Sequence, residues 1–483
     1  MMMYRLTTVL LVILSTLLFA GPQADTIPLT TQSDDALQLF LRGRDLAEKL
    51  RGQESIRHYQ RAVELDPNFA IAHLNLALVQ PTAKDFFESL NRAKELADKV
   101  SEGERLWILG VDAGVNGFPM KQREYYLKLV QLYPNDERAH NLLGTHYFAQ
   151  QEYDKAIAEY SRAIRINPGF SQAYNQLGYA YRFIGNYDES EKSFQAYIEL
   201  IPDDPNPYDS YAELLMKMGK YEPSIEQYKK ALGADPNFVA SHIGIATNLN
   251  LMGKHSEARE QLKKLQSMAR NEGEQRAALF AMAISYVYEA QMEKALEMME
   301  QQYQMGAKIN DHAAMAGDLI AMGNIYYEMG QFDKAKSIYE KANQTIQNSG
   351  HKKEIKDNAQ RNYLYNSARV ALMQKDLTTA RARAEEFRKA VNAIQNQPQI
   401  WLSHEIDGLI ALQEKDYEKA IEELKQANVQ NPYTHYRLAS VYLARGDKEN
   451  ARIFFSNAAE HNTLNSMQHA FIRAKARKML TSL

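Results

Sequence analysis

The sequence has no cysteine and few residues that interrupt helices: 14 prolines and 23 glycines among 483 residues. Without cysteine the chain can form no disulfide, thiolate zinc site or cysteine nucleophile. It also lacks an excess of either charge, because 57 Lys and Arg face 60 Asp and Glu, for a net charge of -3. This balance argues against a nucleic-acid binder, which needs a basic face. The 29 tyrosines suit packed helices whose rings lie half inside a core.

Long apolar runs are missing as well, apart from one near the beginning. Residues 6–20 read LTTVLLVILSTLLFA, and this run of 15 is shorter than the roughly 20 residues that span a bilayer. Arg5 precedes it, and no Lys or Arg follows until Arg42. We expect residues 1–20 to be a signal peptide cleaved after Ala20, and the protein to be exported to the periplasm or outside the cell. An uncleaved N-terminal anchor is the alternative. Residues 21–35 are expected to be a polar linker.

The rest of the chain carries a repeat. Pro134, Pro168, Pro202 and Pro236 are spaced by 34 residues. The same step separates Gly144 from Gly178, Tyr160 from Phe194 and Tyr228, and Gly185 from Gly219 and Gly253. Several residue types in one register at one period indicate a repeated structural unit.

This pattern resembles the tetratricopeptide repeat family, whose unit of 34 residues is a helix–turn–helix. The unit from Glu137 matches the family at seven positions and differs at one, where His140 replaces the usual Trp. The matching residues are Leu143, Gly144, Tyr147, Ala156, Tyr160, Ala163 and Pro168. In physical terms, Gly or Ala lets the two helices of a unit approach closely, large rings fill the space around the contact, and Pro ends the second helix. The stretch from Asn135 to Leu232 is also similar to repeats attached to bacterial signalling kinases and cyclases, although this chain has no kinase or cyclase segment.

The resemblance implies an all-α fold, a right-handed α-solenoid superhelix of about twelve antiparallel helix pairs. We expect a regular array over residues 36–275 and a longer, irregular array over 276–464. The units are expected to start at Ala36, Ala70, Gly103, Glu137, Ser171, Pro205, Val239, Arg276, Ala316, Arg361, Trp401 and Pro432. The weakest units start at Ala70, which Pro81 interrupts, and at Arg276 and Arg361, which lack the turn glycine.

Residues 465–483 are expected to hold a C-terminal helix that caps the solenoid. Met467, Ala470, Phe471 and Ala474 have the spacing of one buried helix face. Basic residues crowd its last turns, which favours a helix C-terminus. Docking of these residues on anionic lipid is the alternative.

Motifs for catalysis or cofactors are absent from the sequence, so we expect no enzyme activity, no cofactor and no metal site. There is no phosphate-binding glycine loop, HExxH or GxSxG motif. Five histidines recur near one repeat position, which favours a packing role over a metal role; they are His73, His140, His242, His404 and His435. In the acidic segment DDPNPYD, Asp203 or Asp204 is expected to cap the next helix, with weak calcium binding as the alternative.

Ligands of this family usually lie on the inner, concave face formed by the first helix of each unit. Amides and aromatic rings dominate the corresponding positions here. The expected partner-binding groove consists of Trp107, Asn141, Thr145, Phe148, Asn175, Tyr179, Arg182, Asn206, Asp209, Glu213, Lys217 and Asn250. Amides can bond a peptide backbone and rings can pack on its side chains. The resemblance therefore implies an exported, non-catalytic scaffold for a protein or peptide. A regulatory or sensor subunit of an envelope or signalling complex, and a glycan-binding protein, are the alternatives.

Overall fold

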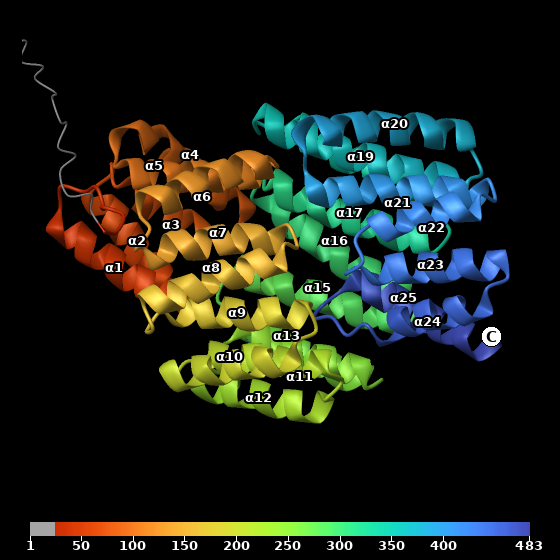
Figure 1. Ribbon diagram of the computed structural model, residues 1–483, viewed down its shortest axis with the longest axis horizontal. Helices are drawn as coiled ribbons and strands as arrows, with labels where there is room; N and C mark the ends of the chain where they lie inside the picture. Colours follow the sequence, from red (N-terminus) through yellow and green to blue (C-terminus); the bar gives the residue numbers. More distant parts are fainter. Residues whose placement is uncertain (1–24) are drawn as a thin grey trace, which may run out of the picture.

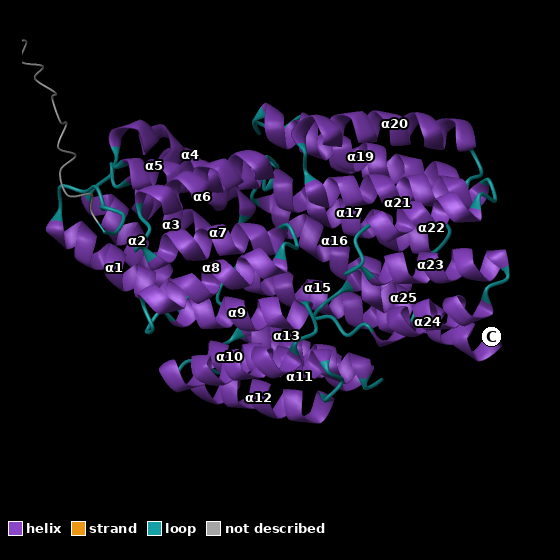
Figure 2. Ribbon diagram, in the orientation of Figure 1, coloured by secondary structure: helices purple, strands orange, loops and turns teal. Residues whose placement is uncertain are grey.

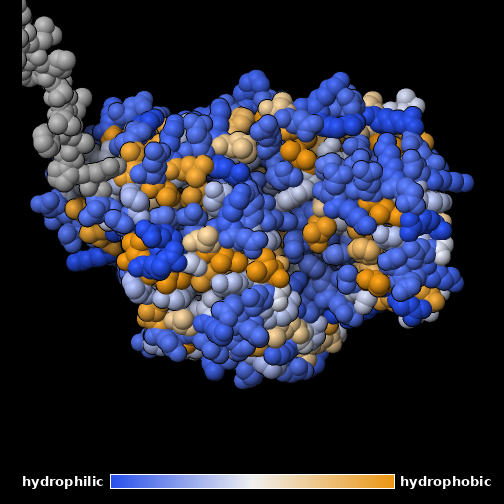
Figure 3. All heavy atoms as spheres, viewed as in Figure 1, coloured by the Kyte–Doolittle hydropathy of each residue, from blue (hydrophilic) through white to orange (hydrophobic). Residues whose placement is uncertain are grey.

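The computed structural model describes residues 25–483, and the predicted signal peptide at residues 1–20 lies outside that part of the chain. Figures 1 and 2 show that the described residues form helices joined by short loops. Twelve consecutive helix pairs are followed by one further helix, α25 (Met467–Ser482). The all-α solenoid expected from the sequence is thus confirmed. The face seen in Figure 3 is largely hydrophilic, with apolar residues in separate groups.

The helix pairs have the following bounds. The first six are α1 (Asp34–Glu48) with α2 (Gly52–Leu65), α3 (Ala70–Val79) with α4 (Ala83–Leu96), α5 (Glu102–Val115) with α6 (Pro119–Leu132), α7 (Glu137–Ala149) with α8 (Tyr153–Ile166), α9 (Ser171–Phe183) with α10 (Tyr187–Leu200), and α11 (Pro205–Lys217) with α12 (Tyr221–Ala234). The next six are α13 (Val239–Leu251) with α14 (His255–Met268), α15 (Glu272–Tyr288) with α16 (Met292–Lys308), α17 (His312–Glu328) with α18 (Phe332–Gln347), α19 (Lys353–Met373) with α20 (Leu377–Ile394), α21 (Gln397–Gln413) with α22 (Tyr417–Gln426), and α23 (Pro432–Arg445) with α24 (Lys448–Glu460).

The predicted starts of the longer units are wrong by one or two helical turns. Helices α15, α17 and α21 begin four residues before the expected Arg276, Ala316 and Trp401, and α19 begins eight residues before Arg361. The 34-residue pattern places the start too late because these first helices have additional turns at their N-termini. In the interrupted second unit, α3 ends before Pro81, yet α3 and α4 still pair.

Close helix contacts within a unit depend on glycine, as predicted. A Cβ atom on Gly144 would lie 2.6 Å from Cε1 of Tyr160, and one on Gly178 would lie 2.6 Å from Cε1 of Phe194. Both rings are completely buried. Gly185, in the turn between two helices, has a φ angle of 78°, which a glycine adopts without strain. These contacts explain why the same residue types recur at one period.

The superhelix makes a turn that brings units distant in sequence side by side (Figure 1). Six hydrogen bonds connect residues of the first turn to the segments that precede helices α15, α17, α19, α21, α23 and α25 of the second turn. The bonded pairs are Gln53 with Asn271, Lys84 with Asp311, Asn91 with Lys352, Gly117 with Asn396, Gln151 with Asn428 and Tyr221 with Asn462. We call this set of contacts the inter-turn seam.

Three seam residues also cap a helix. Asn271, Asp311 and Asn396 are the N-cap residues of α15, α17 and α21, and each accepts a backbone N–H of its own helix through Oδ1. The other polar atom of each side chain bonds to the first turn. One residue thus fixes both the start of a helix and its position against the preceding turn.

The predicted cap at Asp204 is only partly right. Asp204 occupies the N-cap position of α11 and Pro205 opens the helix, but the Asp204 side chain forms no capping hydrogen bond. Its carboxylate instead lies 3.8 Å from Nη1 of Arg51, in the turn between α1 and α2. The nearby cation offers the carboxylate an alternative partner.

Helix α25 packs on α24 and α23 at the end of the solenoid and also on α15 in the middle of the chain. Met467, Ala470 and Phe471 join a cluster with Ile284 and Val287 of α15. The predicted single buried face is therefore incomplete. Ala474 is exposed, whereas His469, Ile472, Arg473 and Ala476 are buried because the helix lies between two surfaces.

Candidate functional site

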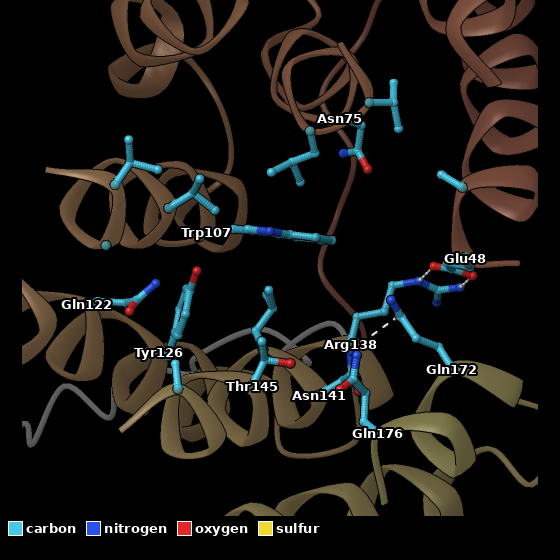
Figure 4. A pocket seen from close by; sticks show the side chains of 18 of the residues that line it. Glu48, Asn75, Trp107, Gln122, Tyr126, Arg138, Asn141, Thr145, Gln172 and Gln176 are labelled. Atoms are coloured by element: carbon cyan, nitrogen blue, oxygen red, sulfur yellow. Dashed lines mark hydrogen bonds and ion pairs between the residues drawn. The ribbon is translucent and has the colours of Figure 1, made fainter. Parts of the chain in front are cut away.

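A cavity of about 780 Å³ lies on the inner face of the first five helix pairs (Figure 4). First helices α3, α5, α7 and α9 contribute most of the amides and the indole that face it. Asn396 and Pro398, from the start of α21, also line it. Because Asn396 donates a hydrogen bond of 3.2 Å to the carbonyl of Gly117, the inter-turn seam closes one side of the cavity.

Part of the cavity wall is apolar and accessible. Leu50 and Leu78 expose 53% and 52% of their surface, and Val115 exposes 37%, and all three line the cavity. Large apolar side chains exposed together in a hollow are typical of binding sites. Covering them with an apolar group would stabilise a complex by about 25 cal/mol for each Å² removed from water.

Two deeply buried polar groups at the cavity have an atom with no partner. Trp107 and Asn141 are 8% and 7% exposed, respectively. Among the described residues, nothing accepts the Nε1–H of Trp107 and nothing donates to Oδ1 of Asn141. In Figure 4 the indole lies between Asn75 on one side and Thr145 with Asn141 on the other. A buried polar group without a partner costs about 1–3 kcal/mol, so this pair is suited to a ligand that supplies one acceptor and one donor.

The charges at the cavity balance one another. Arg138 donates to both oxygens of Glu48 at 2.6 and 3.0 Å, and to Glu137 at 2.5 Å. Arg44 is the other lining cation, and burial followed by the nearby Arg138 lowers the pKa of its guanidinium. Two arginines and two glutamates leave no net charge, which favours an uncharged ligand.

The structure distributes the predicted groove residues over two environments. Trp107, Asn141 and Thr145 line the cavity. Asn175 lies one unit further along the inner face and is 5% exposed, with Oδ1 unpartnered among the described residues. Phe148 packs edge-on against Tyr153 and Phe183. These residues belong to the first half of the expected groove.

The second half of the expected groove is joined by internal hydrogen bonds. Glu213 accepts from the Tyr179 hydroxyl and from Arg182, both at 3.0 Å. The remaining bonds are from Asn206 to the Tyr197 hydroxyl, from the Ser241 hydroxyl to Asp209, and from the Ser285 hydroxyl to Asn250. Residues from neighbouring units thus bond to each other along the inner face.

Burial alters the ionisation of this second half. It raises the pKa of Asp209, and the neighbouring Glu213 carboxylate raises it further. Burial, with a contribution from Arg182, lowers the pKa of Lys217 to about 8. His461 and His469, from the C-terminal segment, lie close enough to Lys217 for its charge to lower their pKa values. The C-terminal segment therefore lies near this end of the expected groove.

Sequence reasoning missed several cavity residues. Gln122 and Tyr126 come from a second helix, α6, whereas the prediction used only first helices. Asn75 belongs to the second unit, which the prediction left out. Gln172 accepts from Asn141 at 3.3 Å and belongs to a first helix, α9, so a wider search of the first helices would have included it. No sequence signal places Asn396 there, because its position depends on the superhelical turn.

The recurring histidines have packing partners. The Nε2 atoms of His73, His140 and His242 lie 2.9–3.1 Å from the carbonyl oxygens of Pro67, Pro134 and Pro236. Nδ1 of His404 lies 2.8 Å from Glu423. Over residues 25–483, no group of three or more His, Asp or Glu side chains is arranged to hold a metal ion. In the same range no helix is long and apolar enough to cross a membrane.

Comparison with known families gives matches in five segments. A model described as "TPR repeat" matches residues 51–80 and 144–183, and one described as "Tetratricopeptide repeat" matches residues 171–204, 206–238 and 319–347. Four of these segments lie in the regular array, and the fifth, residues 319–347, lies in one of the longer units. No curated protein matches the chain.

Two solved structures are similar to parts of the chain. A tetratricopeptide repeat protein from Parabacteroides merdae ATCC 43184 is 16% identical, with a TM-score of 0.36, over 55% of this chain and 99% of the other. MamA is 23% identical, with a TM-score of 0.24, over 40% of this chain and 94% of the other.

Proposed function

Because this chain belongs to the tetratricopeptide repeat family, we propose that it is a non-catalytic scaffold that holds a peptide or protein segment in the cavity of its first five helix pairs. Repeats of this kind form extended inner surfaces on which partners bind. In this cavity, side chains from several units of that surface remain available to a partner.

The observation that carries this proposal is the pair of unpartnered atoms at Trp107 and Asn141. A peptide group supplies a carbonyl acceptor for the indole N–H and an N–H donor for the amide oxygen. Exposed Leu50, Leu78 and Val115 offer contacts for the side chains of the same segment. Backbone bonding combined with apolar contacts is a common mode of peptide recognition.

The neutral cavity favours an uncharged stretch of the partner. Since Arg138 is paired with Glu48 and Glu137, a charged ligand would have to compete with existing ion pairs. Binding should therefore depend weakly on salt, unlike association that is driven by charge. We also propose that the protein acts after export, on the basis of the apolar run at residues 6–20.

Fluorescence of Trp107 tests the proposal. The chain has two tryptophans, so Trp401→Phe leaves Trp107 as the single reporter. This variant would be titrated with a panel of end-capped, uncharged peptides that carry apolar side chains, and with a panel of oligosaccharides. Saturable changes in emission with peptides support the proposal. A response to oligosaccharides alone would instead identify a glycan-binding protein, and no response to either panel would contradict binding in the cavity.

A further inference from the structure

A second, smaller cavity of about 250 Å³ lies on the inner face of the second turn, between α17, α19, α21 and α23, with α25 beside it. Two arginines from two different helices line it, Arg369 of α19 and Arg437 of α23. They are 7% and 8% exposed, respectively. Buried guanidinium groups remain charged, so each requires compensation.

Arg437 has a carboxylate partner, whereas Arg369 does not. Nη1 of Arg437 lies 2.5 Å from Oε2 of Glu405. Nη1 of Arg369 donates to the neutral amide oxygens of Asn366 and Asn324, at 3.1 and 3.4 Å, and the guanidinium also interacts with the hydroxyl of Tyr339, so all of these partners are uncharged. Its Nε has no partner within residues 25–483, and no carboxylate of that range forms an ion pair with it.

Aromatic rings surround Arg369 without neutralising it. Its guanidinium lies 4.4 Å from the ring centre of Tyr327 and 5.3 Å from that of Tyr365. Burial raises the pKa values of Tyr365 and Tyr433 above the ordinary value, so both phenols are neutral. The second nearby carboxylate, Glu328, already pairs with Lys475 and accepts from Tyr433.

The charges around the cavity therefore do not balance. Arg369 and Arg437 face the single carboxylate of Glu405, because Glu328 and Lys475 cancel each other. One positive charge remains in a site lined by amides, which can bond an anion. A monoanion neutralises the site, whereas phosphate, with a charge of about -1.5 to -2 when esterified, exceeds the requirement.

We propose that this second cavity, which we call the arginine cavity, binds one carboxylate group attached to an apolar moiety. Arg369 supplies the charge, because a guanidinium fork matches the two oxygens of a carboxylate. Leu402, Met467 and Phe471 line the same cavity and contact the apolar part. Either a free small acid or the C-terminal residue of a peptide provides this chemistry.

An acid and its amide share the same apolar part, but only the acid carries a charge, so a comparison of the two tests whether the cavity requires a carboxylate. Phenylacetate and phenylacetamide would each be titrated into the full-length chain by calorimetry in buffer of low chloride. The acid should bind at least tenfold more tightly than the amide, and more tightly than inorganic phosphate. Equal binding of acid and amide, or no binding of the acid, would overturn the proposal, and neither result depends on a variant.

Substitution then assigns the interaction to Arg369. Arg369→Gln keeps a hydrogen-bonding amide but removes the charge, and should lower the affinity for phenylacetate at least tenfold. Arg381→Gln removes the same charge from a side chain that is 62% exposed on α20, and should leave the affinity unchanged. Equal effects of the two substitutions would contradict a role of Arg369 in binding.

A short peptide that ends in phenylalanine, with a free or an amidated C-terminus, distinguishes the two sources of the carboxylate. Binding of only the free-ended peptide assigns the arginine cavity to a peptide terminus. Binding of phenylacetate without either peptide assigns it to a small acid. Since Trp107 lies in the other cavity, its fluorescence response to uncharged peptides is independent of both outcomes.

Discussion

Asn396 donates a hydrogen bond of 3.2 Å from Nδ2 to the carbonyl oxygen of Gly117, 279 positions earlier in the chain. With Oδ1, the same side chain accepts the backbone N–H of Gln399 and caps α21. One amide thus joins the two turns of the superhelix and fixes the start of a helix beside the first cavity. Asn396 and Pro398 of the second turn therefore form part of the wall of this cavity.

Asn396→Ser separates the two roles of this side chain. Serine is also a good N-cap residue but has no amide donor to reach Gly117. The variant should keep its helix content. It should lose the hydrogen bond between the turns, which lowers stability by about 0.5–1.5 kcal/mol, and Trp107 should become more accessible to a quencher. Acrylamide quenching of the Trp401→Phe background measures this accessibility.

Asn186→Ser is the matched control for that variant. Asn186 caps α10 through Oδ1, and its side chain has no bond to the second turn among the described residues. Quenching should remain at the parental level. If Asn396→Ser also leaves quenching unchanged, the seam does not control closure of the cavity.

The close helix contacts predict opposite effects of two Gly→Ala substitutions. A Cβ atom at Gly178 would lie 2.6 Å from the Phe194 ring, so Gly178→Ala should destabilise the protein, by about 1–3 kcal/mol, as overpacking does. Gly233 is in α12 with no atom within 4 Å of its added Cβ, so Gly233→Ala should stabilise by up to about 1 kcal/mol. Denaturant unfolding compares them, and a stabilising Gly178→Ala would contradict the contact.

Stability should fall in acid because of the C-terminal histidines. Burial, with the neighbouring Arg473, lowers the pKa of His469 to about 2, and burial, with Lys217, lowers that of His461 to about 3. Below pH about 6.5 the unfolded chain binds protons that the folded chain cannot. Above this pH each histidine is neutral in both the folded and the unfolded chain, so it does not affect the free energy of unfolding. At pH 5 it is protonated only in the unfolded chain, and each histidine should lower the free energy of unfolding by about 2 kcal/mol.

His469→Gln tests this pH dependence. Glutamine can still accept from the Tyr288 hydroxyl, which lies 3.0 Å from Nδ1 of His469, but it does not titrate. The loss of stability between pH 7.5 and pH 5 should shrink in this variant. His58→Gln, at a partly buried position on α2, should change the loss much less. Equal pH profiles for all three proteins would refute the assignment.

Export remains a prediction that the protein's own N-terminus can test. The apolar residues 6–20 and the lack of Lys and Arg up to Arg42 predict cleavage after Ala20. Mass spectrometry of the native protein should find an N-terminus at Gly21. A Met1 terminus in a soluble cytoplasmic fraction would contradict export.

The periodic part of the fold could be predicted because each unit depends on local contacts. Gly178 and Phe194 belong to one unit, so their partnership follows from their spacing. The longer units were placed less well, since their additional N-terminal turns do not follow the 34-residue period. Their caps, such as Asn271 and Asp311, are the local signal that could have corrected the starts.

The candidate sites depend on how the superhelix turns, which no local pattern specifies. Asn396 reaches Gly117, and α25 reaches α15, only because small rotations between units accumulate along the array. Arg369 is not among the predicted site residues because the expected groove ends at Asn250. The arginine cavity also requires residues from four units and α25, so the imbalance of charge becomes visible only in three dimensions.

The most direct test of the central claim is the effect of Asn141→Ala on the affinity for a peptide that changes Trp107 fluorescence. The variant removes the acceptor Oδ1 that has no partner among the described residues, and binding should weaken by about 0.5–1.5 kcal/mol without a change in helix content. Gln195→Ala removes an exposed amide from α10 and should bind as the parent does. Weaker binding by Asn141→Ala alone is the predicted result, and equal affinities of all three proteins would contradict recognition of a partner in this cavity.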